Sequence, residues 1–369
     1  NKDEFKSNSN FLVSNFSIVS LNENLALSNF SILNYKKNFY AYISPFFFTN
    51  SEIKNKFSNL YEKNFIRLFE PVNKDQSGIG YKNEWLLFQI GRGRESWGAG
   101  SDIQLALSEN SNDYDYFLLF SDYGNIRVNY IHGFLETTLD DFNRYITARG
   151  IEWTNKKFLV IGLSEIVIYS GLNRSLDIGY INPISSHIEI ESNNRLNTTN
   201  IKNVPSNSNG VWQMSIDYLW NNYLRFSINY LLDEFVIDKN IEKNKDHGKA
   251  YSVRIASSPN RSKNYILTKY ITYVKVGTYT FRHGMGTNNL VHQGKPLGWY
   301  NGSDGHELKI GLNFFNRKNL IFSASCGILE TGDENLIYRV FDSYANLEKG
   351  KFPSGEVEKK SFINSSIQW

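Results

Sequence analysis

The 369-residue chain has very little cysteine, and its charges nearly cancel. Because Cys326 is the only cysteine, the chain can form neither an intramolecular disulfide nor a cysteine-rich metal site. We expect Cys326 to be a small buried or membrane-facing residue. Lys and Arg number 40 against 37 Asp and Glu, a net charge of +3. This balance argues against nucleic acid as the main partner, because phosphate binding needs clustered basic charge.

No run of apolar residues is long enough for a transmembrane helix, which needs about 20 of them. The longest candidate, Phe158 to Leu172, is interrupted by Glu165. This absence does not exclude a transmembrane β-barrel, since barrel strands alternate and give a weak hydropathy signal. The chain begins at Asn1 without a basic and then apolar leader, so we interpret it as either a mature chain or a fragment.

The common motifs of enzymes and metalloproteins are missing as well. The sequence contains no GxSxG, HExxH, CxxC or EF-hand spacing. Its histidines are scattered, which favours ordinary hydrogen-bonding roles: His132, His187, His247, His283, His292 and His306. We therefore expect no cofactor, no bound metal and no enzymatic activity.

Strict alternation of apolar and polar residues begins near residue 79. In Val211 to Asp233, two alternating runs flank the short turn Asn221-Asn222-Tyr223, which predicts an antiparallel hairpin. The segments Tyr145 to Tyr169 and Leu308 to Ile328 repeat this pattern. The predicted strands reach about nine or ten residues, which suits a tilted membrane-spanning strand better than the strand of about five or six residues in a soluble sandwich.

Aromatic residues flank the predicted short turns, where the interfacial girdle of a barrel lies. They are Trp153, Phe158, Trp220, Tyr223, Phe314 and Phe315. Longer polar stretches at 193–210, 239–249 and 283–306 separate the hairpins. Because short turns at one rim and long loops at the other are typical of outer-membrane proteins, we predict an all-β, transmembrane, antiparallel up-and-down β-barrel over residues 79–369. A soluble β-sandwich is the alternative fold, since an apolar strand face can pack on a second sheet instead of lipid.

Residues 1–78 differ in composition from the rest of the chain and are rich in Asn, Ser, Lys and Phe. Within Ser51 to Phe69, apolar residues recur at helical spacings, at Ile53, Phe57, Leu60, Tyr61, Phe65 and Leu68. Ser51 is a suitable N-cap. The pattern predicts an N-terminal segment, residues 1–78, with one amphipathic helix.

The densest polar block is Gly91 to Gly100, with the sequence GRGRESWGAG. It is neither a dinucleotide fingerprint nor a Walker loop, because its glycine spacing fails and no βαβ unit follows. Its candidate ligand-binding residues are Arg92, Arg94, Glu95 and Trp97. A plain structural turn is the competing interpretation of this block.

Further charged residues are predicted on the inward-facing register of the strands. They are Arg144, Arg149, Glu165, Arg174, Asp217, Asp233 and Glu234. Unpaired charges are costly in a soluble core, but in a barrel they can pair across the lumen. Such residues either form an ion-paired lumen network or bind a sugar polymer through bidentate hydrogen bonds, for which Arg suits acidic sugars.

Several short runs resemble the capsule assembly Wzi family over roughly residues 79–369. They are Glu95 to Gly100, Arg144 to Gly150, Gly162 to Glu165, Ile181 to Pro183 and Asp233 to Phe235. The resemblance implies an outer-membrane β-barrel of eighteen strands with helical elements. It also implies a lectin that attaches capsular or other surface polysaccharide to the cell, and the present chain is short for that plan.

We therefore expect an outer-membrane, monomeric protein that contacts outer-membrane lipid and binds surface or capsular polysaccharide without catalysis. A porin or polysaccharide-transport channel is the alternative, since inward charges can also set the selectivity of a pore. A surface glycosidase that uses a carboxylate pair such as Glu95 and Glu165 is a third hypothesis.

Overall fold

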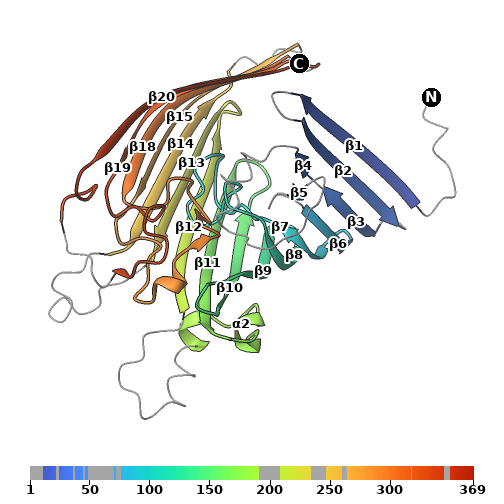
Figure 1. Cartoon of the computed structure of the whole chain (residues 1–369). Helices are drawn as coiled ribbons and strands as arrows, with labels where there is room; N and C mark the ends of the chain where they lie inside the picture. The colour runs from blue at the N-terminus through green and yellow to red at the C-terminus, as the bar shows by residue number, and fades with distance from the viewer. Residues whose placement is uncertain are drawn as a thin grey trace, which may run out of the picture.

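The computed structural model describes residues 11–21, 25–35, 38–44, 46–48, 70–71, 76–190, 208–233, 247–259, 264–316, 318–344 and 350–369. Nearly all of the regular structure in these ranges is β-strand (Figure 1). Within the same ranges, no helix is long and apolar enough to cross a membrane. The predicted helix at Ser51 to Phe69 lies outside the described residues.

Most of the strands are long, as the alternating sequence predicted. They are β1 (Phe11–Leu21), β2 (Leu25–Tyr35), β3 (Phe39–Ser44), β4 (Phe46–Phe48), β5 (Glu70–Pro71), β6 (Gln76–Lys82), β7 (Leu86–Gly93), β8 (Tyr114–Asp122), β9 (Ile126–Thr137), β10 (Phe142–Thr154), β11 (Leu159–Leu172), β12 (Ser208–Trp220), β13 (Leu224–Leu232), β14 (Lys249–Ser257), β15 (Ile266–Val276), β16 (Val291–His292), β17 (Lys295–Pro296), β18 (Gly305–Phe315), β19 (Ile321–Thr331) and β20 (Glu358–Gln368). The short helices are α2 (Ile178–Ile181) and the 3-10 turn η1 (Gly286–Asn288).

All strands except β16 and β17 belong to one antiparallel sheet of 18 segments. From β6 to β15 each strand pairs with the next in sequence, β15 pairs with β18 across a long loop, and β18, β19 and β20 follow in order. Two strand positions are each divided into two segments that lie end to end. β3 and β4 both pair with β2, while β6 pairs with β3 and β5 pairs with β4. The sheet curls around, with β1 and β20 as its edges among the described residues (Figure 1). The predicted all-β, antiparallel up-and-down barrel is confirmed.

The three hairpins predicted from alternation are present. They are β12 with β13, β10 with β11, and β18 with β19. In the first turn, Asn221 and Asn222 have φ angles of 47° and 59°. Asn tolerates this left-handed conformation better than most residues, so the Asn-Asn pair permits the tight reversal.

The two rims of the sheet differ as predicted. At one rim the strands are joined by short turns such as 83–85, 123–125, 155–158 and 221–223. At the other rim most connections are long, including 94–113, 173–207, 277–304 and 332–357, although β9 and β10 are joined by only 138–141. Long loops mark the extracellular side of outer-membrane barrels.

The predicted boundary between residues 78 and 79 does not coincide with an edge of the sheet. It falls inside β6, and β1 to β4 of the expected N-terminal segment pair in the same sheet. The first 75 residues carry more Asn and Lys than the remainder, but part of them nevertheless supplies strands. Composition alone therefore did not separate a domain from the barrel wall.

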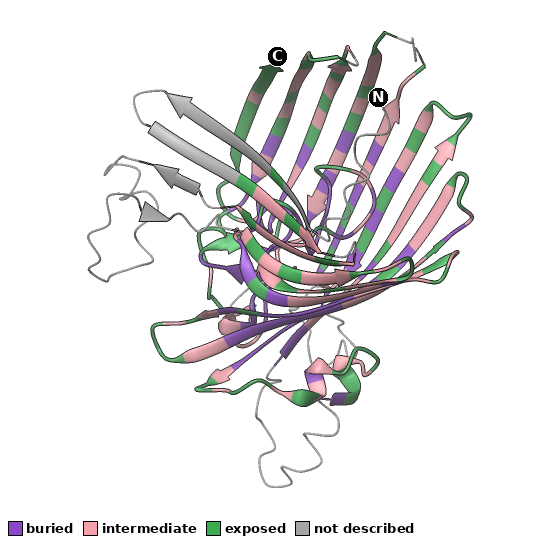
Figure 2. Ribbon diagram, turned by 90° about the vertical axis from the view of Figure 1, so that its right-hand side faces the viewer, coloured by how far each residue is buried: buried purple, intermediate pink, exposed green. Residues whose placement is uncertain are grey.

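Burial changes from residue to residue along many strands (Figure 2), as expected where successive side chains point to opposite faces of a sheet. One row of paired positions is apolar across seven strands: Tyr218, Phe226, Ile255, Ile271, Ile310, Cys326 and Ile363. The adjacent row on the opposite face is mostly polar: Asp217, Ser227, Arg254, Thr272 and Lys309. The apolar row faces lipid and the polar row faces the lumen, so Cys326 lies on the outer, membrane-facing side.

Candidate functional site

Residues 94–113, between β7 and β8, fold back into the barrel and pack on the inner face of β12 to β14. The Asn229 side-chain amide donates to Ala99 O over 2.9 Å, and its oxygen accepts from Ala99 N over 2.7 Å. Gln213 donates to Trp97 O over 3.3 Å. Ser252 Oγ donates to Ile103 O over 2.7 Å. Inward side chains thus satisfy the loop's backbone groups, which otherwise would be buried without partners.

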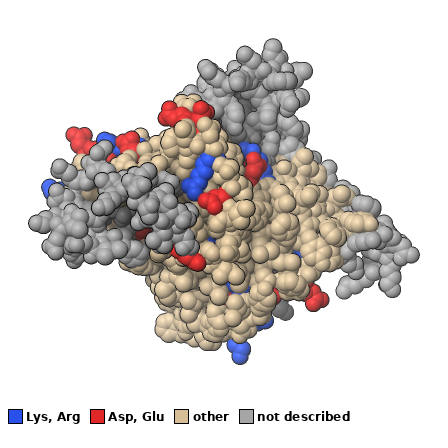
Figure 3. Space-filling view, turned by 90° about the horizontal axis from the view of Figure 1, so that it is seen from below, with Lys and Arg blue, Asp and Glu red and all other residues tan. Residues whose placement is uncertain are grey.

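Residues 277–304, between β15 and β18, pack on this first loop. Trp299 N donates to Leu105 O over 3.0 Å, and Ser108 N donates to Leu297 O over 2.9 Å. These apolar side chains have at most 1% of their surface exposed and belong to the main hydrophobic core. We call residues 94–113 and 277–304 the lumen plug. Seen from the long-loop end, most of the described surface belongs to uncharged residues, with a few charged side chains among them (Figure 3).

Arg144 on β10 anchors the second loop of the lumen plug. Its buried guanidinium donates to the carbonyl oxygens of Thr287, Asn289 and Val291, the last two over 2.6 and 3.0 Å. It also pairs with Glu136 on β9. Arg144 therefore holds this loop in place, and its guanidinium is not open to a ligand.

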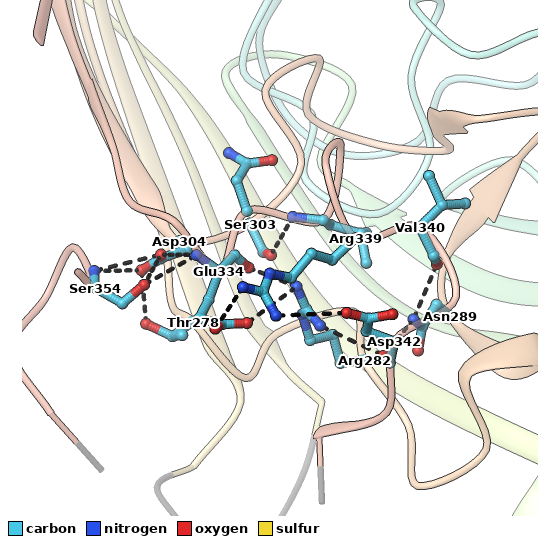
Figure 4. A network of polar contacts seen from close by, with 12 residues as sticks. Thr278, Arg282, Asn289, Ser303, Asp304, Glu334, Arg339, Val340, Asp342 and Ser354 are labelled. Atoms are coloured by element: carbon cyan, nitrogen blue, oxygen red, sulfur yellow. Dashed lines mark hydrogen bonds and ion pairs between the residues drawn. The ribbon is translucent and has the colours of Figure 1, made fainter. Parts of the chain in front are cut away.

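A second polar network joins the lumen plug to the loop between β19 and β20 (Figure 4). The buried Asp304 carboxylate accepts from Thr278 Oγ1 over 2.7 Å, from Ser354 N over 3.0 Å and from Glu334 N over 3.2 Å. Arg282 donates to Glu334 O over 2.6 Å. These contacts hold the long loops together at their rim of the barrel.

Beside the lumen plug, tyrosines gather on the inner face of β3 and β8. Gln89 on β7 accepts from Tyr40 Oη over 2.6 Å and donates to Tyr42 Oη over 3.1 Å and to Tyr116 Oη over 2.9 Å. The rings of Tyr40 and Tyr42 stack with their centroids 6.4 Å apart. We call Tyr40, Tyr42, Gln89 and Tyr116 the tyrosine platform.

Glycines on β6 and β7 create the space for these rings. A Cβ atom at Gly78 would lie 2.8 Å from Tyr42 Cε1, and one at Gly80 would lie 2.7 Å from Tyr40 Cε1. Real Cβ atoms essentially never approach so closely, so any side chain there would displace the rings. The glycines let the tyrosines lie against the sheet with one side left open.

A pocket of about 290 Å³ opens over the tyrosine platform, near the long-loop end of the strands. It is lined by Phe30, Ile32, Tyr40, Tyr42, Gln76, Gly93, Arg94 and Tyr116. Arg94 is held by a 3.2 Å hydrogen bond to Ser111 O and lies 3.8 Å from the Asp113 carboxylate. Aromatic faces, the Gln76 amide and one oriented guanidinium thus line the same hollow.

Glu95 lies next to this pocket on the lumen plug. Burial raises the pKa of its carboxyl, while hydrogen bonds from the Trp97 and Tyr116 side chains oppose the shift. A carboxyl that is protonated more readily would repel an acidic ligand less. The Arg94 guanidinium at the pocket therefore lies near two acidic side chains, the Asp113 carboxylate and the Glu95 carboxyl.

The structure separates the residues of the GRGRESWGAG block. Arg94 lines the pocket and Glu95 borders it, whereas the Trp97 ring is buried in the core against Gly150, so it offers no open face to a ligand. Arg92 lies outside the lumen, because it pairs in register with Asp115 in the outward row that contains Phe134. Its guanidinium is 3.7 Å from the Asp115 carboxylate.

Arg149 and Glu165 also lie outside the lumen, which corrects their expected place. Arg149 pairs in register with Glu165, and Glu165 pairs with Trp212 in the outward row of β12. Arg174 lies on the same outer side, 4.7 Å above the Tyr169 ring. Arg144 and Arg149 are five positions apart on one strand, so alternation puts them on opposite faces.

The remaining predicted residues have structural contacts. Asp217 forms a two-pronged ion pair with Arg225 on the inner face, and Asp233 accepts a hydrogen bond from Phe281 N of the lumen plug. Glu234 lies outside the described residues. The structure adds Arg254, whose guanidinium stacks 3.8 Å over the Tyr270 ring, to the lumen network.

The sequence analysis missed the tyrosine platform. A period-two signal could have found it, since Tyr40 and Tyr42 are spaced like the glycines that face them, Gly78 and Gly80. Among the described residues, no group of three His, Cys, Asp or Glu side chains is arranged to hold a metal ion.

No protein-family model and no curated protein matches this chain. Among solved structures, it is similar to Wzi of Escherichia coli, described as an outer-membrane, carbohydrate-binding β-barrel involved in group 1 capsule assembly. The TM-score is 0.60 at 11% identity, over 97% of this chain and 81% of that chain. An anion-selective porin from Comamonas acidovorans gives a TM-score of 0.48 at 10% identity, over 97% and 99% of the two chains.

OmpT, an outer-membrane protein of Vibrio cholerae, gives the same TM-score of 0.48 at 10% identity, over 98% of this chain and 99% of that one. At such identities the likeness to Wzi shows the fold alone. The chain is an outer-membrane β-barrel, as the sequence predicted.

Proposed function

We propose that this protein binds an extracellular polysaccharide in the pocket over the tyrosine platform, as a monomer and without catalysis, in the manner of a Wzi-type lectin. The observation that carries the proposal is the pocket itself. Flat tyrosine faces pack against sugar rings, while Gln76 and Arg94 offer hydrogen bonds at the edges. Capsular or other surface polysaccharide is the ligand class that suits a pocket at the long-loop end.

An acidic polymer is the preferred ligand within this class. Arg94 presents a guanidinium, which suits carboxylates such as those of uronic acids. Burial raises the pKa of the nearby Glu95 carboxyl, while the Asp113 carboxylate pairs with Arg94 from the side of the lumen plug. We therefore expect a uronate polymer to bind more tightly than a neutral glucan.

The lumen plug supports a binding protein over an open channel. Its two loops bury apolar side chains against each other inside the barrel, which leaves little room for a water-filled path. We expect low conductance in planar lipid bilayers. A large, steady current through single barrels would instead support the porin alternative.

The proposed glycosidase pair does not meet. Glu95 borders the inner pocket, whereas Glu165 lies on the outer face, where it contacts His187. The wall of the barrel separates the two carboxyls, so they cannot flank one glycosidic bond as the reaction requires. This arrangement supports a non-catalytic function.

The test measures binding of polygalacturonate and of dextran to the protein refolded in detergent. Replacing Tyr42 with Ala should weaken polygalacturonate binding by about tenfold, equivalent to about 1.4 kcal/mol, because a ring face is lost. Arg94→Gln should remove the preference over dextran. Tyr338→Ala is the matched control, since Tyr338 is 64% exposed on the loop between β19 and β20, outside the pocket. Unchanged binding by Tyr42→Ala in folded protein would reject the proposal.

A further inference from the structure

The outer face of β10 and β11 carries charge where the neighbouring strands are apolar. The Arg149 guanidinium lies 3.4 Å from the Glu165 carboxylate, and their side chains are only 12% and 2% exposed. On β11 and β12, the next outward residues toward the short-turn rim are Leu163 and Met214, both about half exposed as lipid-facing residues should be. Bare charges at this place would be costly in a bilayer.

Residues 173–190, which we call the outer strap, cover these charges. His187 Nδ1 lies 2.7 Å from the Glu165 carboxylate. Tyr180 stacks on Tyr169 with ring centroids 4.2 Å apart. Tyr130 Oη donates to Ile181 O over 2.7 Å. The outer strap is thus fixed to the wall by its polar and aromatic side chains, and Figures 1 and 2 show its helix α2 beside the long-loop end of β10 and β11.

The other side of the outer strap is apolar and exposed. Ile178, Ile184 and Ile188 have 81%, 89% and 58% of their surface exposed. Tyr180 and Ile190, by contrast, are buried toward the wall. The exposed residues of the strap also include the polar Asn182 and Glu189. The strap therefore exposes three isoleucines beside a few polar side chains, more apolar surface than a segment that faces water usually shows.

The height of the outer strap matches an interface of the membrane. Glu165 pairs in register with Trp212, and Tyr230 and Tyr251 follow in the next outward row toward the short turns, the row of Leu163 and Met214. Trp and Tyr in such positions mark the headgroup level of a barrel, and Trp212 contacts the strap residue His187 at 6.5 Å between ring centroids. The isoleucines continue the lipid-facing surface of Leu163 and Met214 at this level.

We propose that the outer strap is an interfacial membrane anchor, whose isoleucines Ile178, Ile184 and Ile188 insert among the acyl chains of the outer leaflet. The occupant of this surface is lipid hydrocarbon. The strap restores an apolar exterior over a wall that carries Arg149 and Glu165. This inference rests on the outer-membrane fold and is independent of what the lumen binds.

The chain's single cysteine makes the test direct. In a Cys326→Ser background, Ile184→Cys is labelled with a nitroxide, and the protein is refolded into phospholipid vesicles. Accessibility to dissolved oxygen, which concentrates in lipid, is compared with accessibility to a water-soluble nickel chelate. The wild-type label at Cys326 on outward β19 is the lipid reference, and Tyr338→Cys in the same background is the water reference.

We expect the ratio of oxygen to nickel accessibility at position 184 to be several-fold higher than at position 338 and close to that at Cys326. A ratio equal to that at position 338 would overturn the proposal. A label at position 184 that is shielded from both reagents only at high protein-to-lipid ratio would assign the surface to a second copy, which would also overturn it.

A second variant tests the consequence for stability without relying on a label. Ile184→Asp combined with Ile188→Asp should lower the unfolding midpoint in vesicles but leave it unchanged in detergent micelles, which adapt to the local surface. Heat-modifiable migration on a gel checks that the variant folds. Equal loss in both environments would assign the isoleucines to internal packing and contradict the anchor.

Discussion

The barrel wall carries two clusters that use the same residue types on opposite faces. On the inner face, the tyrosine platform with Arg94 and Glu95 stays open to a pocket. On the outer face, Tyr130, Tyr145 and Tyr169 gather with Arg149 and Glu165 under the outer strap.

The difference lies in what each face meets. The inner cluster rests on glycines, and its polar edges can stay hydrated in the lumen. The outer cluster would meet lipid, so a segment of the chain seals it and satisfies its charges. Tyrosine and arginine therefore indicate a binding surface only on the face that opens to water.

The largest expected effect is on the free energy of unfolding. It is measured with two single variants, each of which removes one carboxylate, from the outer and from the inner face. Glu165→Ala leaves the buried Arg149 without its ion partner and should cost about 3 to 5 kcal/mol of unfolding free energy. Asp217→Ala breaks the inner pair with Arg225, whose side chain is 58% exposed, and should cost less than about 1 kcal/mol. Urea titrations in vesicles, followed by heat-modifiable migration, measure both.

A double variant sharpens this prediction. Arg149→Met combined with Glu165→Met removes both outer charges and should recover most of the stability lost by Glu165→Ala, because the uncompensated charge is gone. If the two single variants lose the same stability, the two faces do not differ electrostatically and the comparison fails.

Much of the wall could be predicted from the sequence. Alternation and the polar turns gave the hairpins of β10 to β13 and β18 to β19, because a strand with one face in lipid must repeat every two residues. The same rule, applied to Arg144 and Arg149, would have shown that both cannot point inward. The error came from judging the charges by type and not by their position along the strand.

The lumen plug and the pocket could not be predicted in the same way. Asn229 and Ala99 are 130 positions apart in the sequence, and no local pattern predicts which loop an inward amide side chain will bind. The outer strap could not be predicted for a related reason. In the sequence Glu165 only interrupts an apolar run, and its partner His187 is identified only in the folded structure. Long-range partners decide the role of such polar residues.

Acid should loosen the lumen plug through His292. This imidazole is buried beside Asp113 O, and burial lowers its pKa from 6.5 to about 4. Between these values the unfolded chain binds a proton that the folded protein does not, so stability should fall as pH drops from 6.5 to 4, by at most about 3 kcal/mol. His292→Gln should flatten this slope in urea titrations, while His306→Gln, at a more exposed site, should keep it.

Glu95 should give a smaller slope of the opposite sign at the open face. Burial raises the pKa of its carboxyl above the ordinary value of 4.5. From pH 4.5 up to that raised value, the folded protein holds a proton that the unfolded chain has lost, so this contribution to stability disappears as pH rises. Measured in the His292→Gln background, Glu95→Gln should remove the remaining decline, whereas Glu109→Gln, an exposed acid on the same loop, should leave it in place. If the decline survives Glu95→Gln, the Glu95 carboxyl is not its source and is already ionised in this pH range. The expected preference of the pocket for acidic sugars would then rest on Arg94 alone.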